Sequence, residues 1–245
     1  MQIRESVVVV TGASRGIGAE FVRQLRERGA ARVVAGARDA STVAGVGTDP
    51  VTGTVVEAVS LDVTDHEAVQ RVADAAGDVT IVVNNAGISS AIPLVTGDLA
   101  AIRREFETNV FGPLAVTRAF ADTLARNGGG AVLNVLSASS WSSFPGATTY
   151  GATKAAAWGL TDGLRLELGA QGTQVTGLHM GLVDTDMTAG FDGEKITVAD
   201  VVTAALDGLE RGDLEVLADE PARQVKASLA LDPTDRYAGM LPARV

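Results

Sequence analysis

Short runs of apolar residues alternate along the chain with longer stretches in which apolar residues recur at helical spacing. Several short runs are continuous in Val, Ile and Leu, which is typical of strands buried on both faces of a parallel sheet. Such alternation predicts a doubly wound sheet with right-handed crossovers. The expected strands are 6–10, 32–35, 54–61, 79–83, 131–136, 174–178 and 214–217, and the expected helices are 17–28, 67–76, 98–126, 150–168 and 198–211.

The chain shows no sign of internal division. No repeat, low-complexity tract or Pro/Ser-rich linker interrupts it, so we predict a single domain over residues 1–245. Residues 39–53 are the one irregular stretch, with three Gly, one Pro and few periodic apolar positions. We expect the crossover helix there to be short or missing, as an eroded surface connection rather than a functional insertion.

Composition excludes several classes of function. The 245 residues include 30 acidic and 20 basic side chains, a net charge of −10, and this acid excess argues against binding to a nucleic-acid backbone. The absence of cysteine excludes a disulfide scaffold, a thiolate nucleophile and a cysteine metal site. No apolar stretch approaches the ~20 residues of a membrane helix. We therefore expect a cytoplasmic protein with no nucleic-acid or membrane partner.

A glycine-rich turn follows the first expected strand and opens the first expected helix. It reads Thr-Gly-Ala-Ser-Arg-Gly-Ile-Gly over residues 11–18. Gly12 can adopt a tight turn, Gly16 lets the backbone approach a pyrophosphate, and Gly18 permits close packing of helix on strand. The helix N-terminus adds unpaired N–H donors and a positive dipole. This context predicts a dinucleotide phosphate site.

Tyr150 and Lys154 are four residues apart and share a helix face. A lysine ammonium beside a phenol stabilises the phenolate, so we expect the Tyr150 pKa to fall from its usual ~10. That would make Tyr150 a general acid/base for an alcohol–carbonyl pair; the alternative is a surface Tyr/Lys pair.

Ser137 lies thirteen residues before Tyr150, at the end of an expected strand. Because ligands of such sheets bind outside the carboxyl ends of the strands, its hydroxyl should reach the crevice and polarise a substrate oxygen. A nucleophilic role is the rival, but no Gly-x-Ser-x-Gly turn surrounds it. His66 and His179 are expected to be structural, and neither has metal-ligand spacing, so we predict no metal. Mid-helix Asn109 is, from its position alone, either a solvated residue or a functional one.

Taken together, these motifs resemble the short-chain dehydrogenase/reductase family. The resemblance rests on the turn at 11–18, Asp62-Val63, Asn-Asn-Ala-Gly at 84–87, Asn109, Ser137 and Tyr150-x3-Lys154, and it extends from residue 6 to about 187. It implies a Rossmann-like, mostly parallel seven-stranded sheet with helices on both faces. It also implies an oxidoreductase that transfers a hydride between NADP(H) and a carbonyl or alcohol substrate.

The resemblance implies a role for each site residue. Tyr150 is the acid/base, Lys154 tunes it and holds the nicotinamide ribose, Ser137 polarises the carbonyl, and Asn109, in a helix distortion, relays protons through a water. The other implied cofactor contacts are Gly12, Ser14, Arg15, Gly16, Ile17, Gly18, Arg38, Asp62, Val63, Asn85, Ala86, Gly87, Gly181, Val183 and Thr185.

The end of the second expected strand predicts the choice of cofactor. An enzyme that prefers NAD places an acidic side chain there to bind the ribose 2′-hydroxyl. This chain has Ala37 at that position, followed by Arg38, and Arg15 precedes Gly16. Two guanidinium groups suit a 2′-phosphate, so we predict NADP(H). Two alternatives remain: a register shift that brings Asp39 to the ribose, and arginines that are only solvated surface charges.

The chain departs from the family pattern in two places. Met180 stands where the family usually has proline, which should leave the following loop less preorganised. The usual Gly-rich C-terminal ending is replaced by residues 214–218 and 221–245, which puts the common tetramer in doubt. We expect a homodimer through helices 98–126 and 150–168, with a tetramer as the alternative, because both helices carry apolar residues on more than one face.

Three segments should form the mouth of the substrate site: 89–97, 138–146 and 187–197. They offer few cations and several apolar side chains, so we expect an apolar or aromatic carbonyl compound, although these residues could be ordinary packing. The apolar residues are Ile92, Leu94, Trp141, Phe144, Met187 and Phe191. A non-catalytic NADP-binding regulator on the same fold is the alternative function. A sugar-nucleotide epimerase would need a longer C-terminal half.

Overall fold

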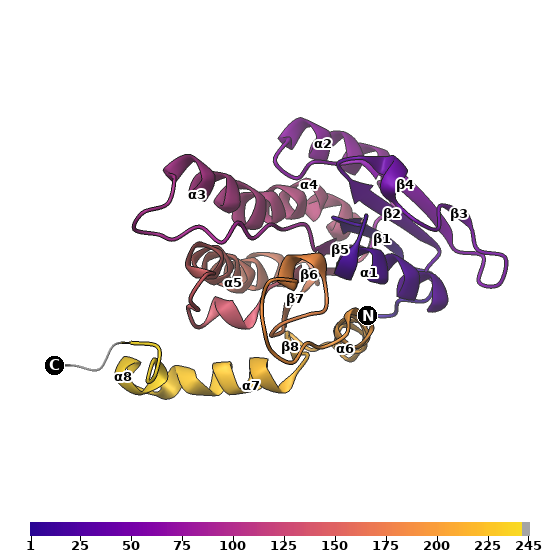
Figure 1. Cartoon of the computed structure of the whole chain (residues 1–245). Helices are drawn as coiled ribbons and strands as arrows, with labels where there is room; N and C mark the ends of the chain where they lie inside the picture. Colours follow the sequence, from indigo (N-terminus) through magenta and orange to yellow (C-terminus); the bar gives the residue numbers. More distant parts are fainter. Residues whose placement is uncertain (242–245) are drawn as a thin grey trace.

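The computed structural model describes residues 1–241, and its centre is one eight-stranded sheet in the order β3-β4-β2-β1-β5-β6-β7-β8 (Figure 1). The seven predicted strands are all present and parallel, which confirms the doubly wound fold. The eighth strand, β3, is a two-residue addition that pairs antiparallel with β4. The strands are β1 Val7–Thr11, β2 Arg32–Ala37, β3 Gly47–Thr48, β4 Val55–Ser60, β5 Ile81–Asn84, β6 Ala131–Val135, β7 Gln174–His179 and β8 Glu215–Leu217.

Helices cover both faces of the sheet, as predicted. Successive residues of β1 show why: Val8 and Val10 belong to the core under α1 and α6, whereas Val9 belongs to the core under α2, α4 and α5. Each core therefore buries one face of the central strands. The helices are α1 Gly16–Glu27, α2 His66–Ala75, α3 Leu99–Phe106, α4 Gly112–Arg126, α5 Thr148–Gly169, α6 Val198–Arg211, α7 Glu220–Ala227 and α8 Pro233–Arg236.

The long helix expected over 98–126 is interrupted. A π-helical turn, η2 (Glu107–Phe111), separates α3 from α4 and carries Asn109. Gly112 follows it, and a Cβ there would lie 2.7 Å from Val63 Cγ2, so the glycine lets the helix pass close to the loop after β4. A π turn of this kind is frequent at functional sites.

Two segments outside the regular pattern take defined conformations. Residues 39–53 form the 3₁₀ turn η1 (Ala40–Thr42) and the hairpin of β3 with β4, so the expected crossover helix is indeed missing. The residues after β8, for which no helix was expected, form α7 and α8 as an arm in which α7 packs on β8 and on the 3₁₀ turn Ala138–Ser140 (Figure 1). In the part of the chain described, no helix is long and apolar enough to cross a membrane.

Candidate active site

The glycine-rich turn between β1 and α1 has the backbone its sequence predicts. Gly12 and Gly16 have φ angles of +68° and +54°, a region that favours glycine. A Cβ on Gly18 would lie 2.1 Å from Gly12 O, so only glycine lets α1 pack this closely on the turn. All three glycines are therefore required by the local geometry.

The turn is fastened to the segment after β5. Asn85 Nδ2 donates to the carbonyl oxygens of Thr11 and Gly12 at 2.9 and 3.1 Å. Thr11 Oγ1 accepts the backbone N–H groups of Asn85 and Ala86, each at 3.0 Å. Thr11, the first residue of the turn, was not among the predicted site residues, although its buried hydroxyl aligns the two predicted cofactor segments; its place at the end of a strand was the available signal.

The N-terminus of α1 has the features of an anion site. Arg15 is the N-cap, no side chain caps the helix, and its first turn carries no acidic residue. Ser14 and Ile17 lie beside it, half-buried. The first N–H groups of a helix need partners, and a phosphate oxygen is a suitable one. The residues present therefore fit a dinucleotide pyrophosphate.

The end of β2 favours a 2′-phosphate over a bare ribose. Ala37 is the buried last residue of the strand, and Arg38, which follows it, is exposed. Asp39 Oδ1 accepts the Ser41 backbone N–H at 3.0 Å and the Ser41 hydroxyl at 2.6 Å, so this carboxylate is engaged within η1.

Asp62 and Val63 lie at the other side of the expected adenine position. Asp62 Oδ1 accepts the backbone N–H and the hydroxyl of Thr64 at 2.9 and 2.7 Å, which fixes the loop after β4. The capping role belongs to Asp65, which accepts from Ala68 N at the start of α2. Val63 is buried against Gly112.

The loop after β7 closes the site from the opposite side. Thr185 faces the turn, since its Cγ2 lies 3.4 Å from where a Cβ of Gly16 would be. Val183 forms a bridge with Ile196, and Gly181 N donates to Asp219 Oδ2 at 2.8 Å. The buried Met180 accepts a backbone hydrogen bond from Ala138. These bonds hold the loop without the proline that the family usually has.

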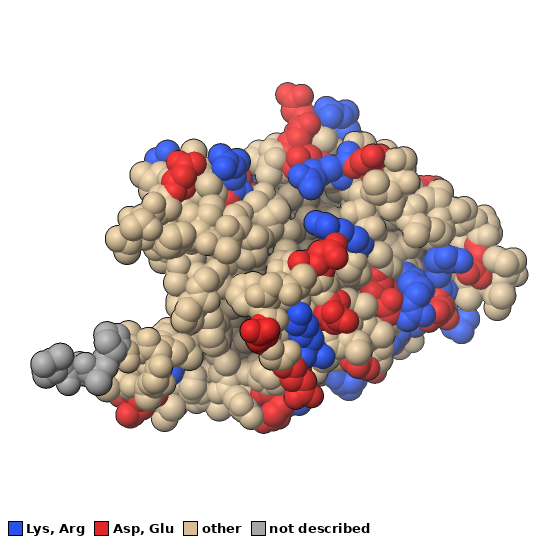
Figure 2. All heavy atoms as spheres, viewed as in Figure 1, with Lys and Arg blue, Asp and Glu red and all other residues tan. Residues whose placement is uncertain are grey.

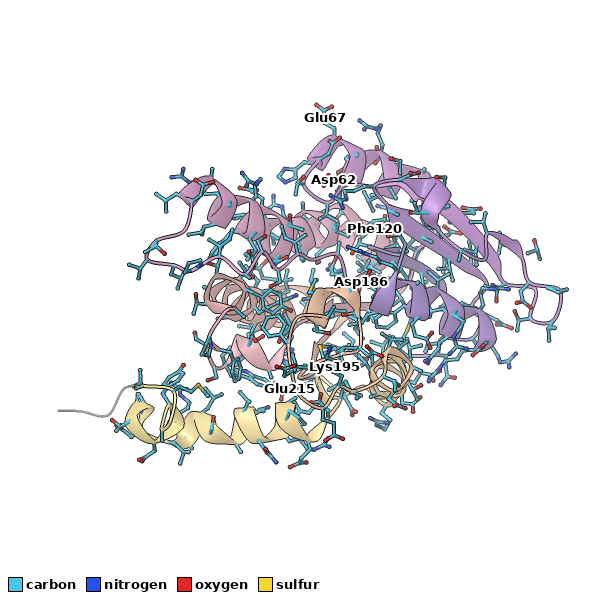
Figure 3. All side chains as sticks on the ribbon, in the orientation of Figure 1. Asp62, Glu67, Phe120, Asp186, Lys195 and Glu215 are labelled. Atoms are coloured by element: carbon cyan, nitrogen blue, oxygen red, sulfur yellow. The ribbon has the colours of Figure 1, made fainter. Side chains whose placement is uncertain are left out.

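Arg15 is paired with an acidic side chain in this structure. Its guanidinium pairs with the Asp186 carboxylate at 2.9 Å, and both side chains are about three-quarters exposed, at 75% and 77%. Figure 3 labels Asp186 in the loop that follows β7. The pair thus joins the glycine-rich turn to this loop.

Ser137, Tyr150 and Lys154 meet at the carboxyl end of β6. Ser137 follows the strand, and its Oγ accepts from Ser139 N at 3.0 Å. Tyr150 lies in the first turn of α5, and the Ser137 side chain is among the groups that lower the Tyr150 pKa. Lys154 Nζ lies 5.6 Å from the Tyr150 ring centroid and donates to Val135 O at 2.7 Å. The sequence prediction that these three residues converge agrees with this geometry.

The expected lowering of the Tyr150 pKa is wrong for this arrangement. Burial raises the pKa of Tyr150 to about 12, the Ser137 hydrogen bond opposes the rise and the Glu105 carboxylate adds to it. Burial also lowers the pKa of Lys154 to about 8. The error came from weighing the lysine charge without the desolvation of the phenol.

Asn109 lies at the centre of the π turn and is buried. Its Oδ1 accepts from Ile88 N at 2.9 Å, and its Nδ2 donates to Ile88 O at 2.8 Å and to Thr153 Oγ1 at 3.0 Å. A Cβ on Gly87 would lie 3.3 Å from Asn109 Oδ1 and 3.9 Å from Lys154 Nζ. The helix distortion is thus observed, and it brings Asn109 beside the lysine.

Trp141 is a correction to the expected substrate mouth. It is only 5% exposed, and its ring stacks on His179 with centroids 3.8 Å apart. His179 Nδ1 in turn donates to Ser137 O at 3.0 Å, and burial lowers the His179 pKa to about 4. The two rings therefore support the backbone of Ser137 from below. Both residues act in packing, which was the expectation for His179 and the stated alternative for Trp141.

The surface around the site has no dominant charge on the visible face. Figure 2 shows acidic and basic side chains interspersed there, with charges of both signs over α3 and few over the region of α5. Among residues 1–241 no cluster of three His, Cys, Asp or Glu side chains could hold a metal ion.

Comparison with known proteins decides the family. The model of the short chain dehydrogenase family matches residues 6–195. The chain belongs to this family. An uncharacterized oxidoreductase of Staphylococcus saprophyticus is 31% identical over 220 residues, which cover 86% of this chain and 94% of that protein.

Two similar solved structures are informative. A short chain dehydrogenase from Burkholderia cenocepacia in complex with NADP is 39% identical, with a TM-score of 0.91, covering 99% of this chain and all of that one. The bulky-bulky ketone specific alcohol dehydrogenase from Comamonas testosteroni is 26% identical, with a TM-score of 0.78 and 98% and 96% coverage. The chain is an oxidoreductase of this family.

Proposed function

We propose that the protein is an NADP(H)-dependent carbonyl reductase or alcohol dehydrogenase. The observation that carries the proposal is the convergence of Ser137, Tyr150 and Lys154 at the end of β6, with Asn109 in the adjacent π turn. When bound, NADPH supplies the hydride that reduces the carbonyl carbon.

Each of the four residues then has its own role in the proton transfer and in binding. Ser137 donates a hydrogen bond to the carbonyl oxygen and stabilises its developing negative charge. Tyr150, whose pKa of about 12 keeps it protonated at neutral pH, gives its proton to that oxygen. Lys154, as an ammonium, holds the ribose hydroxyls and stabilises the phenolate that remains. Asn109, bonded to Ile88, keeps a water beside Lys154 that returns the proton.

The cofactor choice follows from the end of β2 and from the turn. Ala37 leaves no carboxylate to repel a 2′-phosphate, Asp39 is engaged by Ser41, and the Arg38 guanidinium is free to approach. Arg15 joins it when it leaves Asp186. The NADP complex of the Burkholderia relative supports the same choice.

The substrate proposed is a bulky apolar or aromatic carbonyl compound, bound between segments 89–97, 138–146 and 187–197. Leu94 is 49% exposed and Met187 45% exposed, and Ile92 and Phe191, from the same segments, are half-buried. The ketone specificity of the Comamonas relative supports this class. The test is a panel of aromatic ketones, aliphatic ketones, phosphorylated sugars and dicarboxylates, each with NADPH and with NADH. Best turnover of a bulky ketone supports the proposal. A preference for polyanions contradicts the substrate class, and no turnover of any carbonyl or alcohol favours a non-catalytic regulator.

We also propose a homodimer through α4 and α5. Phe111, just before α4, is 46% exposed, and Leu166 on α5 is 85% exposed. Apolar side chains left exposed on two neighbouring helices are typical of a covered face. Light scattering at micromolar concentration should give twice the chain mass of 25.1 kDa, and a species of the chain mass alone would contradict the dimer.

A further inference from the structure

His179, the last residue of β7, is fully buried although its imidazole is polar. Its Nδ1 donates to the Ser137 carbonyl oxygen at 3.0 Å, whereas its Nε2 has no hydrogen-bond partner within the described residues. A buried polar atom without a partner destabilises a fold, and an apolar side chain of similar shape would avoid that cost. Packing alone therefore does not account for a histidine at this position.

The partner of Nδ1 fixes the tautomer of the ring. A carbonyl oxygen can only accept a hydrogen bond, so Nδ1 carries the proton and Nε2 of the neutral imidazole carries a lone pair. The Glu215 carboxylate lies 4.0 Å from Nε2, but its other oxygen pairs with Lys226 on α7. This ion pair weakens the repulsion between the carboxylate and the lone pair of His179.

The charges around the ring keep it neutral. Burial lowers the pKa of His179 to about 4 against the hydrogen bond to the carbonyl, and the cations Lys226, Arg165 and Lys154 act in the same direction as burial. The Glu215 carboxylate is the acidic group that faces the ring. The imidazole is therefore an uncharged hydrogen-bond donor at neutral pH.

Trp141 fixes the orientation of the ring. The two ring planes are 13° from parallel, with centroids 3.8 Å apart. Trp158 on α5 meets Trp141 edge-on at a centroid distance of 6.0 Å, and Lys226 Nζ lies 5.6 Å from the Trp141 ring centroid. Rotation of the imidazole away from the carbonyl would break the stack, so the donor is preorganised.

The same carbonyl belongs to the residue whose hydroxyl faces the reaction. The residues immediately before and after Ser137 donate backbone hydrogen bonds of 2.8 Å to the residues on either side of His179. The Ser137 carbonyl also accepts from Ser140 N at 3.0 Å, within the 3₁₀ turn that follows. Ser137 Oγ accepts from Ser139 N at 3.0 Å, which leaves the hydroxyl proton to donate. The His179 bond thus ties this turn to β7 at the serine itself.

We propose that His179 is a positioning residue: its neutral Nδ1–H imidazole, stacked on Trp141, holds the Ser137 backbone and thereby sets the direction of the Ser137 hydroxyl. A donor that is slightly misplaced stabilises a developing oxyanion less well. His179 acts on the reaction only through Ser137. The effect on turnover rests on the proposed function, whereas the tautomer of the ring does not.

Two substitutions separate the hydrogen bond from the stack. His179→Phe keeps a ring on Trp141 and loses the donor. His179→Asn loses the ring but places an amide N–H where Nδ1 was. His66→Gln, at an exposed position at the start of α2, is the matched control. The measurements are kcat, the substrate KM and the Kd for NADPH, with circular dichroism and Tm to verify folding.

In His179→Phe we expect kcat to fall about three- to tenfold, the range that corresponds to one neutral hydrogen bond, while the Kd for NADPH stays within about twofold. His179→Asn should keep kcat within about twofold of wild type, even where its Tm is lower because the stack is lost. His66→Gln should change none of these values. A His179→Phe variant with the wild-type kcat, or a His179→Asn variant that loses as much as His179→Phe, overturns the proposal.

A double-mutant cycle distinguishes positioning from a general structural role. In a Ser137→Ala background no hydroxyl remains to be directed, so adding His179→Phe should lower kcat by less than about twofold. If His179→Phe lowers kcat by the same factor in both backgrounds, its role is structural and the proposal is wrong.

A readout on the otherwise native chain needs neither turnover nor a change at the site, because the chain has only two histidines. In untagged His66→Gln the imidazole ¹⁵N resonances belong to His179 alone. They should show a protonated Nδ1 and an unprotonated Nε2, unchanged from about pH 8 to about pH 5. A proton on Nε2 in place of Nδ1, or a titration near the usual ~6.5, contradicts the proposal even if the protein proves not to be a reductase. The expected tautomer without turnover of any carbonyl or alcohol contradicts only the proposed function.

Discussion

Replacing Arg38 by alanine tests the assignment of NADP(H) most specifically. Arg38 is exposed at the end of β2, so its truncation should change folding stability by no more than about 0.5 kcal/mol. A hydrogen bond to a charged group is worth ~1.5–3 kcal/mol. The loss of the contact to the 2′-phosphate should therefore lower kcat/KM for NADPH by roughly tenfold to over a hundredfold.

The specificity of that loss is the informative result. NADH carries no 2′-phosphate, so its kcat/KM should stay within about twofold of wild type, since no contact to it is removed. Arg223→Ala, an exposed arginine on α7, is the matched control and should affect neither cofactor. Steady-state rates are compared at fixed substrate and ionic strength. A wild type that favours NADH, or an Arg38→Ala variant that loses both cofactors equally, refutes the reasoning.

Two further substitutions test the walls of the cofactor site. Asp186→Asn frees Arg15 from an exposed ion pair, which is worth ~0–1 kcal/mol. In a fluorescence titration NADPH should therefore bind up to about fivefold more tightly, with little change for NADH. Weaker NADPH binding would contradict this prediction and would mean that the ion pair supports the site. Gly18→Ala forces a Cβ to within 2.1 Å of Gly12 O, and we expect a loss of ~1–3 kcal/mol of stability together with weaker NADPH binding. Gly169→Ala, at the end of α5, is the control, because a Cβ built there has no neighbouring atom within 4 Å; it should leave stability and NADPH binding unchanged. Equal Tm values for Gly18→Ala and Gly169→Ala would contradict the packing argument.

The sheet and its crossovers were predictable because buried parallel strands leave continuous apolar runs, and these seven runs all formed strands. The hairpin of β3 was not, because two exposed residues, Gly47 and Thr48, carry no periodic signal. The π turn at Asn109 was expected only through the family resemblance. A single inserted residue hardly changes the helical spacing of apolar residues, so the sequence pattern alone does not reveal it. The helix α7 was missed because its only buried residue is Ala222. A helix without a stripe of apolar residues leaves no helical periodicity in the sequence from which to predict it.

The candidate site also contains features that could be predicted from the sequence and features that could not. Glycines with a positive φ and a Tyr/Lys pair at helical spacing are local features, so the turn and the pair on α5 could be found from sequence. Long-range contacts could not: the stacking of Trp141 on His179 and the hydrogen bonds of Asn109 to Ile88 and Thr153 join residues distant in the chain. The sign of the Tyr150 pKa shift was also missed, because burial depends on the whole fold.

The most direct test of the central claim is Tyr150→Phe, assayed for both turnover and NADPH binding. This change removes the hydroxyl that gives its proton to the carbonyl and leaves the ring between Ser137 and Lys154. The account predicts that kcat for the best carbonyl substrate falls by at least about a hundredfold, the usual contribution of a general acid, while the Kd for NADPH stays within a few-fold of wild type. A Tyr150→Phe variant that keeps most of its turnover while still binding NADPH would contradict the account.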